Sequence, residues 1–543
     1  PEIDFVTIAG DAGTGKTLLT LAAALDLVYE DKLYDEVIVT RATVPLGEEI
    51  GFLPGEEEEK LEPWMGAVFD ALETLSTNPS DSNLERKSSI EFLKSKGVRP
   101  GDRVMLVAEN GIALMCLFVA LSEMDAIAVV INARLSEREL GLIQEDCDPR
   151  VVVFTTDDST DAQAHGNRLG ALADQLSFAK VATSTEFEAS PETVHADPAK
   201  QVLAMIYTTG TTGSPKGVML THQNLSFVAF ISGQLRGISP GDAVYGVLPM
   251  SHAFGLSAVC SAVLFGGGCI HLVSRFDAGK AIRTIAEKNL VGFLGVPTMF
   301  ALMLEKLKDL PDWQAGKLRF MYSGGSPLDP DLKLRAEQQF GLPMHNGYGL
   351  TETGPTISQT RLYLPLDNCS VGYPLPGVET KVVSDTGEVL PANEVGELWV
   401  KGPNIMKGYF RKPEQTAEVL IDDWFNTGDL VSRDETGAIH IAGRTKELII
   451  RSGFNVYPPE VEAVLSSHPD VSLCAVLGKI VDGDEMIVAY VQLVAGRALK
   501  PAVLIDYARR SLSGYKIPGR IEILDQLPTA PSGKILKHQL KSI

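Results

Sequence analysis

The sequence lacks the features that mark secreted, nucleic-acid-binding or membrane proteins. Its six cysteines are scattered without a CxxC pair, which favours free thiols over disulfides or a zinc site. No basic-then-apolar leader opens the chain, so we expect a cytoplasmic protein. Basic residues are in the minority, 48 Lys and Arg against 70 Asp and Glu. The resulting net charge of −22 disfavours nucleic acid or an anionic membrane as the main partner.

Long uncharged runs are also scarce. The stretch that invites a membrane assignment is residues 253–274, which are uncharged and about long enough to span. This stretch contains Gly266, Gly267, Gly268 and His271, so we expect a buried helix followed by a buried strand, and no stable membrane insertion. The 45% hydrophobic and 22% charged content is that of a globular protein, and 543 residues suffice for two to four domains.

Apolar strands alternate with helical patterns through the middle of the chain, which predicts an α/β fold. The expected strands are 103–108, 126–131, 151–155, 202–207 and 292–296. We expect a large domain of mixed, mostly parallel sheets flanked by helices, with a small β subdomain from Gly396 onward, and a compact α+β unit at the end. The predicted domains are 1–78, 79–445 and 446–543, and the sequence leaves the oligomeric state open.

The most informative segment runs from Tyr207 to Val218, where glycines, threonines and a lysine separate two apolar runs. Glycine lets backbone N–H groups close around an anion, and hydroxyls add donors for phosphate oxygens. A flexible linker is the alternative, but its flanks have the pattern of buried strands. The segment therefore predicts a phosphate-binding hairpin, with these candidate residues: Thr208, Thr209, Gly210, Thr211, Thr212, Gly213 and Lys216.

This segment resembles the phosphate loop of the adenylate-forming superfamily, which comprises acyl-CoA synthetases, peptide-synthetase adenylation domains and beetle luciferases. The resemblance continues over about residues 90–543. In the motif Tyr348-Gly-Leu-Thr-Glu352 it implies that Tyr348 stacks on adenine, Thr351 contacts the α-phosphate and Glu352 binds Mg²⁺. The neighbouring residues implied to contact ATP or AMP are Asn346, Gly347 and Gly349.

Two further segments resemble nucleotide-binding parts of the family. Thr427-Gly-Asp429 resembles its ribose-binding segment, and Arg444 follows at the family's spacing. Ser323-Gly-Gly-Ser resembles the loop that borders adenine and the acyl pocket, with Gly324, Gly325 and Ser326 as candidates. Each string alone is an ordinary turn, so the prediction depends on their order along the chain.

The resemblance also supplies catalytic candidates. Lys534 resembles the family's catalytic lysine, which bridges the carboxylate and the α-phosphate, although a lysine near a terminus is ordinarily solvated surface. His252 resembles the gate residue near the substrate carboxylate, although a histidine in an apolar run is most often a core residue. The expected pocket segments (252–256, 295–298, 323–325 and 347) are small or apolar and contain no arginine. We therefore expect a monocarboxylic aliphatic or aryl acid.

The carboxy-terminal unit resembles the family's mobile lid, which rotates for the second half-reaction. The resemblance places the hinge at Lys446 and the coenzyme A tunnel at Ser452, Gly453 and Phe454. The predicted activity is an ATP-dependent acid–CoA ligase that forms an acyl-adenylate, AMP and pyrophosphate. A stand-alone adenylation enzyme that serves a carrier protein or an oxidation is the alternative.

The amino terminus carries a second nucleotide motif, a complete GxxxxGK[ST] between a predicted strand and helix. Its key residues are Gly10, Gly15, Lys16 and Thr17. Residues 1–75 resemble a fragment of a PhoH-like P-loop ATPase that lacks an acidic Walker B strand; residues 151–158 imitate one but fit a strand of the adenylating fold. A second working ATPase is therefore not expected. Two abutting partial folds leave a further alternative, a nucleotide-binding chimera without catalysis.

Overall fold

The computed structural model describes residues 82–543, except 210–214, 452–453, 482–483, 530–534 and 541–543. Ser88–Ile543 form one compact unit. The amino-terminal P-loop residues Gly10, Gly15, Lys16 and Thr17, and the predicted boundary between residues 78 and 79, lie outside the described residues. Within the described part of the chain, no helix has both the length and the apolar character needed to cross a membrane.

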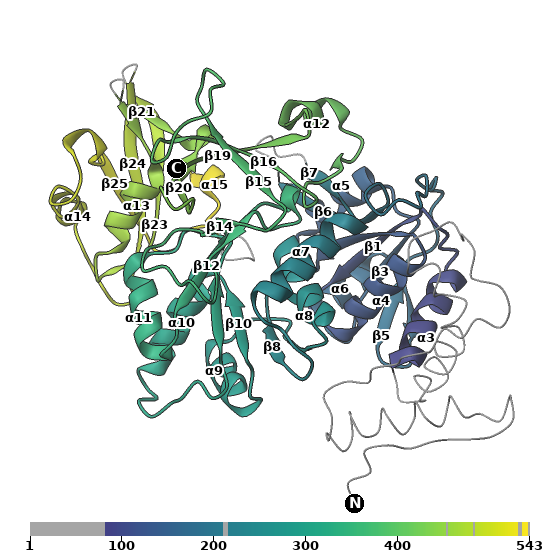
Figure 1. Ribbon diagram of the computed structural model, residues 1–543. Helices are drawn as coiled ribbons and strands as arrows, with labels where there is room; N and C mark the ends of the chain where they lie inside the picture. The colour runs from purple at the N-terminus through teal and green to yellow at the C-terminus, as the bar shows by residue number, and fades with distance from the viewer. Residues whose placement is uncertain (1–81, 210–214, 452–453, 482–483, 530–534, 541–543) are drawn as a thin grey trace, which may run out of the picture. The chain divides into compact units, whose positions relative to one another are not determined.

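An eight-stranded sheet, the first sheet, carries the predicted phosphate hairpin. Its strand order is β17-β7-β6-β2-β1-β3-β5-β4, parallel at the centre and antiparallel toward both edges. Along β1, alternate side chains enter two different hydrophobic clusters, which explains its continuous apolar run. Figure 1 shows α4, α6 and α7 beside this sheet. The strands are β1 (Arg103–Ala108), β2 (Ile127–Asn132), β3 (Val151–Phe154), β4 (Leu172–Gln175), β5 (Lys180–Thr183), β6 (Val202–Thr209), β7 (Pro215–Thr221) and β17 (Gly408–Tyr409).

The helices around the first sheet are α3 (Ser82–Ser95), α4 (Ile112–Glu123), α5 (Glu137–Cys147), α6 (Thr160–Arg168) and α7 (His222–Leu235). Thr221 caps α7 by accepting from the backbone N–H of Asn224, and this cap fixes where the chain turns from β7 into the helix. Residues 151–154 lie inside the first sheet as β3, so the segment that imitates a Walker B strand belongs to this fold.

A seven-stranded sheet, the second sheet, has the order β14-β13-β12-β11-β10-β8-β9. Its strands run parallel from β9 to β12 and antiparallel beyond. Because β10, β11 and β12 are parallel, their carboxyl ends meet at one edge, where α/β folds place ligands. The elements are β8 (Ala243–Gly246), β9 (Cys269–Leu272), β10 (Gly292–Gly295), β11 (Phe320–Ser323), β12 (Met344–Tyr348), β13 (Ser358–Gln359), β14 (Tyr373–Pro374), α9 (Ala278–Glu287), α10 (Pro297–Leu307) and α11 (Pro330–Phe340).

The expectation for residues 253–274 is half right. They begin as a buried π-helix, η1 (Phe254–Ser261), continued by α8 (Ala262–Phe265). The strand that follows, β9, is exposed or only partly buried, because it lies at the edge of the second sheet. An apolar run alone does not distinguish an edge strand from a central one.

The remaining chain forms a third sheet and a small α+β unit. The third sheet contains β15 (Glu379–Val383), β16 (Gly396–Lys401), β18 (Leu420–Ile421), β19 (Trp424–Arg433) and β20 (Ile439–Arg444), and therefore begins before the expected Gly396; α12 (Pro413–Val419) accompanies it. Residues 446–543, called the lid below, contain β21 (Ile449–Arg451), β22 (Phe454–Val456), β23 (Val471–Val481), β24 (Asp484–Leu493), β25 (Arg520–Leu524), α13 (Pro458–Ser466), α14 (Pro501–Ala508) and α15 (Lys537–Leu540). The predicted α/β architecture is confirmed.

Candidate active site

The predicted phosphate hairpin is an antiparallel pair, β6 and β7, in which Thr208 faces Lys216 across the strands. Gly210, Thr211, Thr212 and Gly213 lie outside the described residues. The base of the hairpin is anchored, because the Tyr207 hydroxyl donates to Asp146 at 2.6 Å and Lys412 forms an ion pair with the same carboxylate at 2.6 Å. Burial, together with Cys147 and Asp146 nearby, raises the pKa of Tyr207, which therefore stays a protonated donor.

Glu352 lies in a short 3₁₀ turn, η2 (Thr351–Thr353), that packs against β7. The turn forms because Thr353 accepts from the Leu350 N–H at 3.0 Å and Gly354 closes it with φ +64°. Just before it, a Cβ at Gly349 would lie 1.6 Å from the Pro355 carbonyl oxygen, so the chain admits only glycine there. The candidates Thr351 and Glu352 are thereby held beside the strand that carries Lys216.

Tyr409, which sequence reasoning missed, connects two of these candidates. Its hydroxyl donates to Glu352 Oε1 at 2.9 Å, and the Lys216 ammonium lies 4.9 Å from its ring centroid. Burial and the Glu352 carboxylate raise the pKa of Tyr409 above its ordinary value. The contact exists because β17 pairs with β7, with Tyr409 opposite Val218. A pairing over about 190 residues of chain leaves no local pattern by which the sequence could reveal it.

A second cluster joins the predicted adenine and ribose residues. The Tyr348 hydroxyl donates to Asp429 Oδ2 at 2.5 Å, and Arg444 Nε donates to Oδ1 of the same carboxylate at 3.0 Å. Asp429 and Arg444 are direct partners in the β19–β20 register. Burial and Asp429 raise the pKa of Tyr348; burial lowers that of Arg444, but Asp429 and Glu447 outweigh it and raise the pKa. The arrangement is a protonated phenol and a guanidinium on one buried carboxylate.

The other candidates of the main domain gather at the carboxyl edge of the second sheet. Ser323 ends β11, so Gly324, Gly325 and Ser326 follow at this edge beside Asn346 and Gly347 of β12. His252 is exposed, immediately before the π-helix, and the Phe254 ring packs against Gly324, where an added Cβ would lie 2.9 Å from it. The segment that contains the expected gate residue His252 therefore contacts the loop after β11 through Phe254.

The lid candidates are only partly described. Lys446 lies in a 3₁₀ turn (Thr445–Glu447), and the half-exposed Phe454 ring stacks on Tyr515 with centroids 4.8 Å apart. Ser452, Gly453 and Lys534 lie outside the described residues, so their predicted roles stay predictions.

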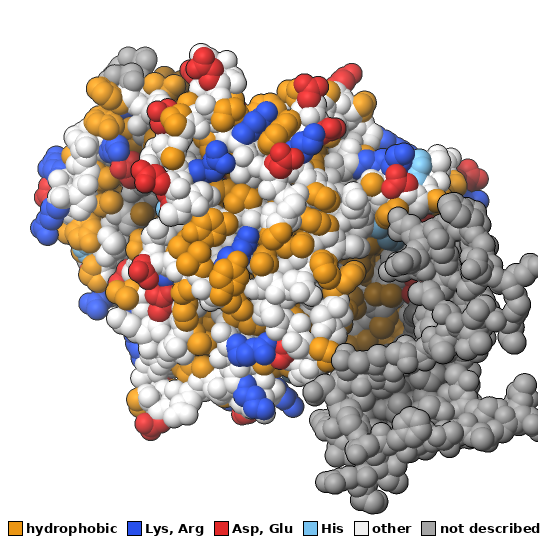
Figure 2. Space-filling model, viewed as in Figure 1, with side chains coloured by type: hydrophobic (Ala, Val, Ile, Leu, Met, Phe, Trp, Pro, Cys, Tyr) orange, Lys and Arg blue, Asp and Glu red, His pale blue; other side chains and the backbone are white. Residues whose placement is uncertain are grey.

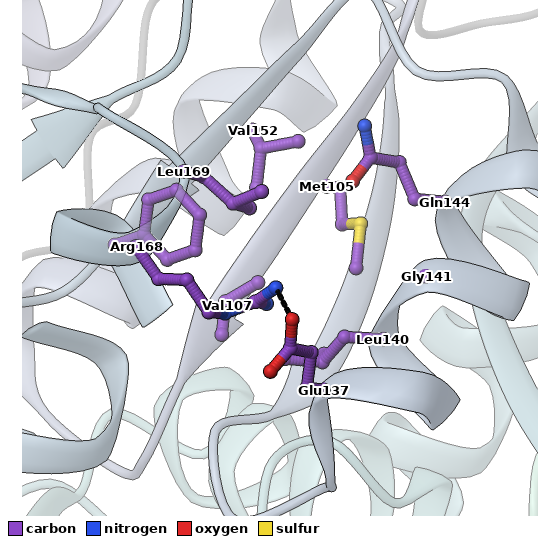
Figure 3. A pocket seen from close by; sticks show the side chains of 10 residues that line it. Met105, Val107, Glu137, Leu140, Gly141, Gln144, Val152, Arg168 and Leu169 are labelled. Carbon is purple, nitrogen blue, oxygen red and sulfur yellow. Dashed lines mark hydrogen bonds and ion pairs between the residues drawn. The ribbon is translucent and has the colours of Figure 1, made fainter. Parts of the chain in front are cut away.

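A cavity between α5, α6 and the first sheet is a separate feature. It has a volume of about 60 Å³, and an ion pair between Arg168 and Glu137 lies at its rim (Figure 3). This volume holds about two waters rather than a nucleotide. None of the candidate residues lines it, and we assign it no ligand.

Comparison with known proteins identifies the chain's relatives. Residues 87–410 match the AMP-binding enzyme family, and residues 460–534 match the AMP-binding enzyme C-terminal domain. Residues 2–101 match the PhoH-like protein family and overlap the first match at 87–101. Feruloyl-CoA synthase of Amycolatopsis sp is 35% identical over 457 residues, covering 83% of this chain and 90% of the relative. 2-Succinylbenzoate–CoA ligase of Bacillus cereus is 33% identical over 458 residues, covering 84% and 91%.

Solved structures agree in fold. ATP-bound MatB from Rhodopseudomonas palustris superposes with a TM-score of 0.73 at 28% identity, covering 84% of this chain and 92% of that one. The o-succinylbenzoate CoA synthetase MenE from Bacillus subtilis, in complex with its acyl-adenylate, gives 0.71 at 30% identity, covering 84% and 91%. The chain belongs to the AMP-binding, adenylate-forming enzymes and is an AMP-forming acyl-CoA ligase.

Proposed function

We propose that this enzyme uses the candidate residues above to activate a carboxylic acid with ATP and to transfer the acyl group to coenzyme A. The observation that carries the proposal is the Tyr409 contact, which holds a phosphate-loop cation and an acidic candidate metal ligand on one buried ring. Both reactants are anions, so the reaction depends on charge neutralisation and positioning. The Asp429–Arg444 pair supplies an acceptor for ribose hydroxyls within the same unit.

Glu352 is the proposed Mg²⁺ ligand. Within the described residues there is no group of three or more His, Cys, Asp or Glu that could hold a metal. An ion held by one carboxylate would take its other ligands from phosphate oxygens and water, as Mg²⁺ prefers. The half-buried Glu352 carboxylate suits this role, since one oxygen already accepts from Tyr409 and carboxylate oxygens have further lone pairs. Bound Mg²⁺ would neutralise phosphate charge.

In the proposed reaction the residues of this chain mainly bind and orient ATP and the carboxylic acid. Lys216 and the hairpin N–H groups bind phosphate, Thr351 contacts the α-phosphate, and Asp429 accepts from the ribose. Lys534 bridges the substrate carboxylate and the α-phosphate as a carboxylate oxygen attacks phosphorus and pyrophosphate leaves. His252 lies by the incoming carboxylate. The coenzyme A thiolate then attacks the acyl carbon, and AMP leaves.

The sequence expectation is a monocarboxylic aliphatic or aryl acid, and the relatives support the aryl alternative. Feruloyl and 2-succinylbenzoyl groups both contain an aromatic ring, but 2-succinylbenzoate carries two carboxylates. The structure describes all six cysteines and forms no disulfide among them, which supports a reducing, cytoplasmic location.

The test is pyrophosphate release across a panel of carboxylic acids, which we expect to require both ATP and an acid. Lys534→Ala should lower the rate at least about a hundredfold, because the cation at the exchanging bond is lost. Lys500→Ala, at an exposed lysine of the lid, is the matched control and should keep the wild-type rate. Undiminished release by Lys534→Ala would refute its assigned role.

Adding coenzyme A separates the alternatives. A thioester detected by mass spectrometry supports the ligase, whereas an adenylate that accumulates without thioester supports an enzyme serving a carrier protein or an oxidation. Stabilisation by ATP without any pyrophosphate release would support the non-catalytic chimera.

A further inference from the structure

Arg236 ends α7 deep in the protein, with only 4% of its surface exposed. Its Nη1 donates to the Ala258 carbonyl and its Nη2 to Gln359 Oε1 at 3.3 Å, while the guanidinium carbon lies 5.1 Å from the Tyr322 ring centroid. The arginine therefore joins the π-helix η1 to strands β11 and β13. It lies outside every segment from which the sequence predicted the acyl pocket.

Each of these three partners adjoins one of those segments. Ala258 follows Phe254 by four residues in η1, about one helical turn away. Tyr322 directly precedes Ser323 on β11, and Gln359 faces Gly347 across the β12–β13 pair. Three of the four expected pocket segments thus have a neighbouring residue in contact with Arg236.

The charge of Arg236 is uncompensated. Within the described residues no carboxylate oxygen lies within 4.0 Å of it, and the same holds for the buried Arg361, which donates to the carbonyls of Gln359 and Pro374. By contrast, the fully buried Arg103 forms an ion pair with Glu192 at 2.6 Å. Burial lowers the pKa of Arg236 to about 10, so it remains charged at neutral pH. A buried cation without an anion is costly, which makes this position unusual.

The guanidinium, a nearby residue of its helix and one of its hydrogen-bond partners carry donors without acceptors among the described residues. Arg236 Nε, Ser232 Oγ and Gln359 Nε2 are buried and have no hydrogen-bond partner within the described residues. Ser232 precedes Arg236 by four residues in α7, so both side chains lie on one helix face. All three groups can donate, and a carboxylate is the group that accepts several such bonds at once.

We propose that Arg236, with Ser232 and Gln359, binds the second carboxylate of a dicarboxylic substrate whose first carboxylate is adenylated. This inference deepens the proposed function and depends on it, and it replaces the expectation of a monocarboxylic acid. The distal carboxylate supplies the anion that the protein itself does not provide.

The first test uses the unmodified enzyme and matched acids, terephthalate against 4-methylbenzoate and adipate against hexanoate. Acid-dependent pyrophosphate release gives kcat/KM for each acid. We expect the dicarboxylic member of at least one pair to be favoured about tenfold or more. If both pairs favour the monocarboxylic acid, the inference fails while the proposed function stands; if no acid supports release, the proposed function itself fails.

The second test changes the arginine. Arg236→Gln should reverse the preference, because the dicarboxylate loses its cation while the monocarboxylate gains a less polar pocket. A purely structural role, such as holding η1, would lower kcat/KM equally for both acids and leave their ratio unchanged, which would overturn the inference. Arg236→Lys keeps the charge and should retain part of the preference, which provides a measurement if the glutamine variant does not fold.

The control is Arg319→Gln, directly before β11, where a half-exposed arginine pairs with Asp242 at 2.6 Å. This variant should keep the wild-type preference. Thermal unfolding of each variant with and without ATP reports whether the fold and nucleotide site are intact.

Discussion

Tyr409 fixes the separation between a cation and an anion that would otherwise attract each other. Its ring lies against Lys216, and its hydroxyl donates to Glu352. The ring is itself held, because the Tyr409 N–H donates to Thr416 at 2.9 Å and Phe410 N–H donates to Gly217 O at 2.8 Å. A donor to a carboxylate limits the directions from which that carboxylate can approach a metal ion.

Tyr409→Phe keeps the ring and removes only this donor. We expect the Mg²⁺ concentration for half-maximal pyrophosphate release to rise about tenfold, the equivalent of about 1.4 kcal/mol. ATP binding measured by calorimetry should weaken in the presence of Mg²⁺ and change little in its absence. Tyr507→Phe, whose hydroxyl contacts Ser467 at the end of α13, is the control. Equal weakening with and without Mg²⁺ would show that the hydroxyl acts on the phosphate loop instead.

Asp429 accepts from both Tyr348 and Arg444, so its charge organises the second cluster. Asp429→Asn removes the charge and with it the ion pair to the half-exposed Arg444 guanidinium. We expect ATP affinity to fall about a hundredfold and the melting temperature to fall as well. Asp423→Asn changes an exposed aspartate near the start of β19 and should leave both quantities as in the wild type. Unchanged ATP affinity in Asp429→Asn would remove Asp429 from the nucleotide site.

At the scale of elements, strand β12 carries a histidine that the fold keeps neutral. The His345 ring stacks on Tyr322 at 4.9 Å and its Nδ1 lies 3.0 Å from Thr360 Oγ1. Burial, helped by Lys333, lowers the pKa of His345 to about 4. In the unfolded chain its pKa is about 6.5. Between these values the unfolded state binds more protons, so this histidine makes the fold less stable as pH falls from about 6.5 to 4.

His345→Gln removes this proton linkage. We expect the free energy of unfolding to fall by about 1–2 kcal/mol less between pH 7 and pH 5 than in the wild type. The measurement is urea unfolding at both pH values. His195→Gln, outside the sheets, is the comparison and should retain the wild-type slope. An unchanged slope in His345→Gln would mean that other groups dominate acid destabilisation.

Local patterns predicted the elements well where the chain itself carries the signal. Strand β1 has the predicted bounds, since both of its faces are buried and its residues are apolar throughout. The β6–β7 hairpin was equally readable, because strand flanks and a Gly-rich loop are adjacent in sequence. The π-helix and the exposed edge strand β9 were not, since the neighbours that bury or expose them come from distant segments.

The sequence analysis named candidate residues motif by motif, but it did not predict the contacts between motifs that are far apart in the chain. Asp429 and Arg444 were named from their motifs, and the structure pairs them across β19 and β20. Tyr409 and Arg236 were missed because each acts through contacts with segments far away in the chain. The sequence around Arg236 gives no sign of a binding role, because arginines are common in helices. The sign is structural: the side chain is buried and no carboxylate of the described residues pairs with it.

For the whole molecule, surface charge supports a small-molecule enzyme. Basic side chains on the face shown in Figure 2 are scattered among acidic and apolar ones. The described candidate residues, from Thr208 to Phe454, all belong to the compact unit Ser88–Ile543. That unit also contains every residue of the two contact clusters. The first cluster is Lys216, Tyr409 and Glu352, and the second is Tyr348, Asp429 and Arg444.

The adenylation activity should therefore not depend on the amino-terminal P-loop. Lys16→Ala in the full chain should leave acid-dependent pyrophosphate release within about twofold of the wild type, since no step of the proposed reaction uses that lysine. A chain truncated to residues 76–543 should unfold cooperatively, gain stability from ATP and keep the same acid preference. Loss of release in Lys16→Ala with the fold intact would instead show that the two nucleotide motifs work together. Loss only in the truncated chain would show that residues 1–75 stabilise the adenylating fold.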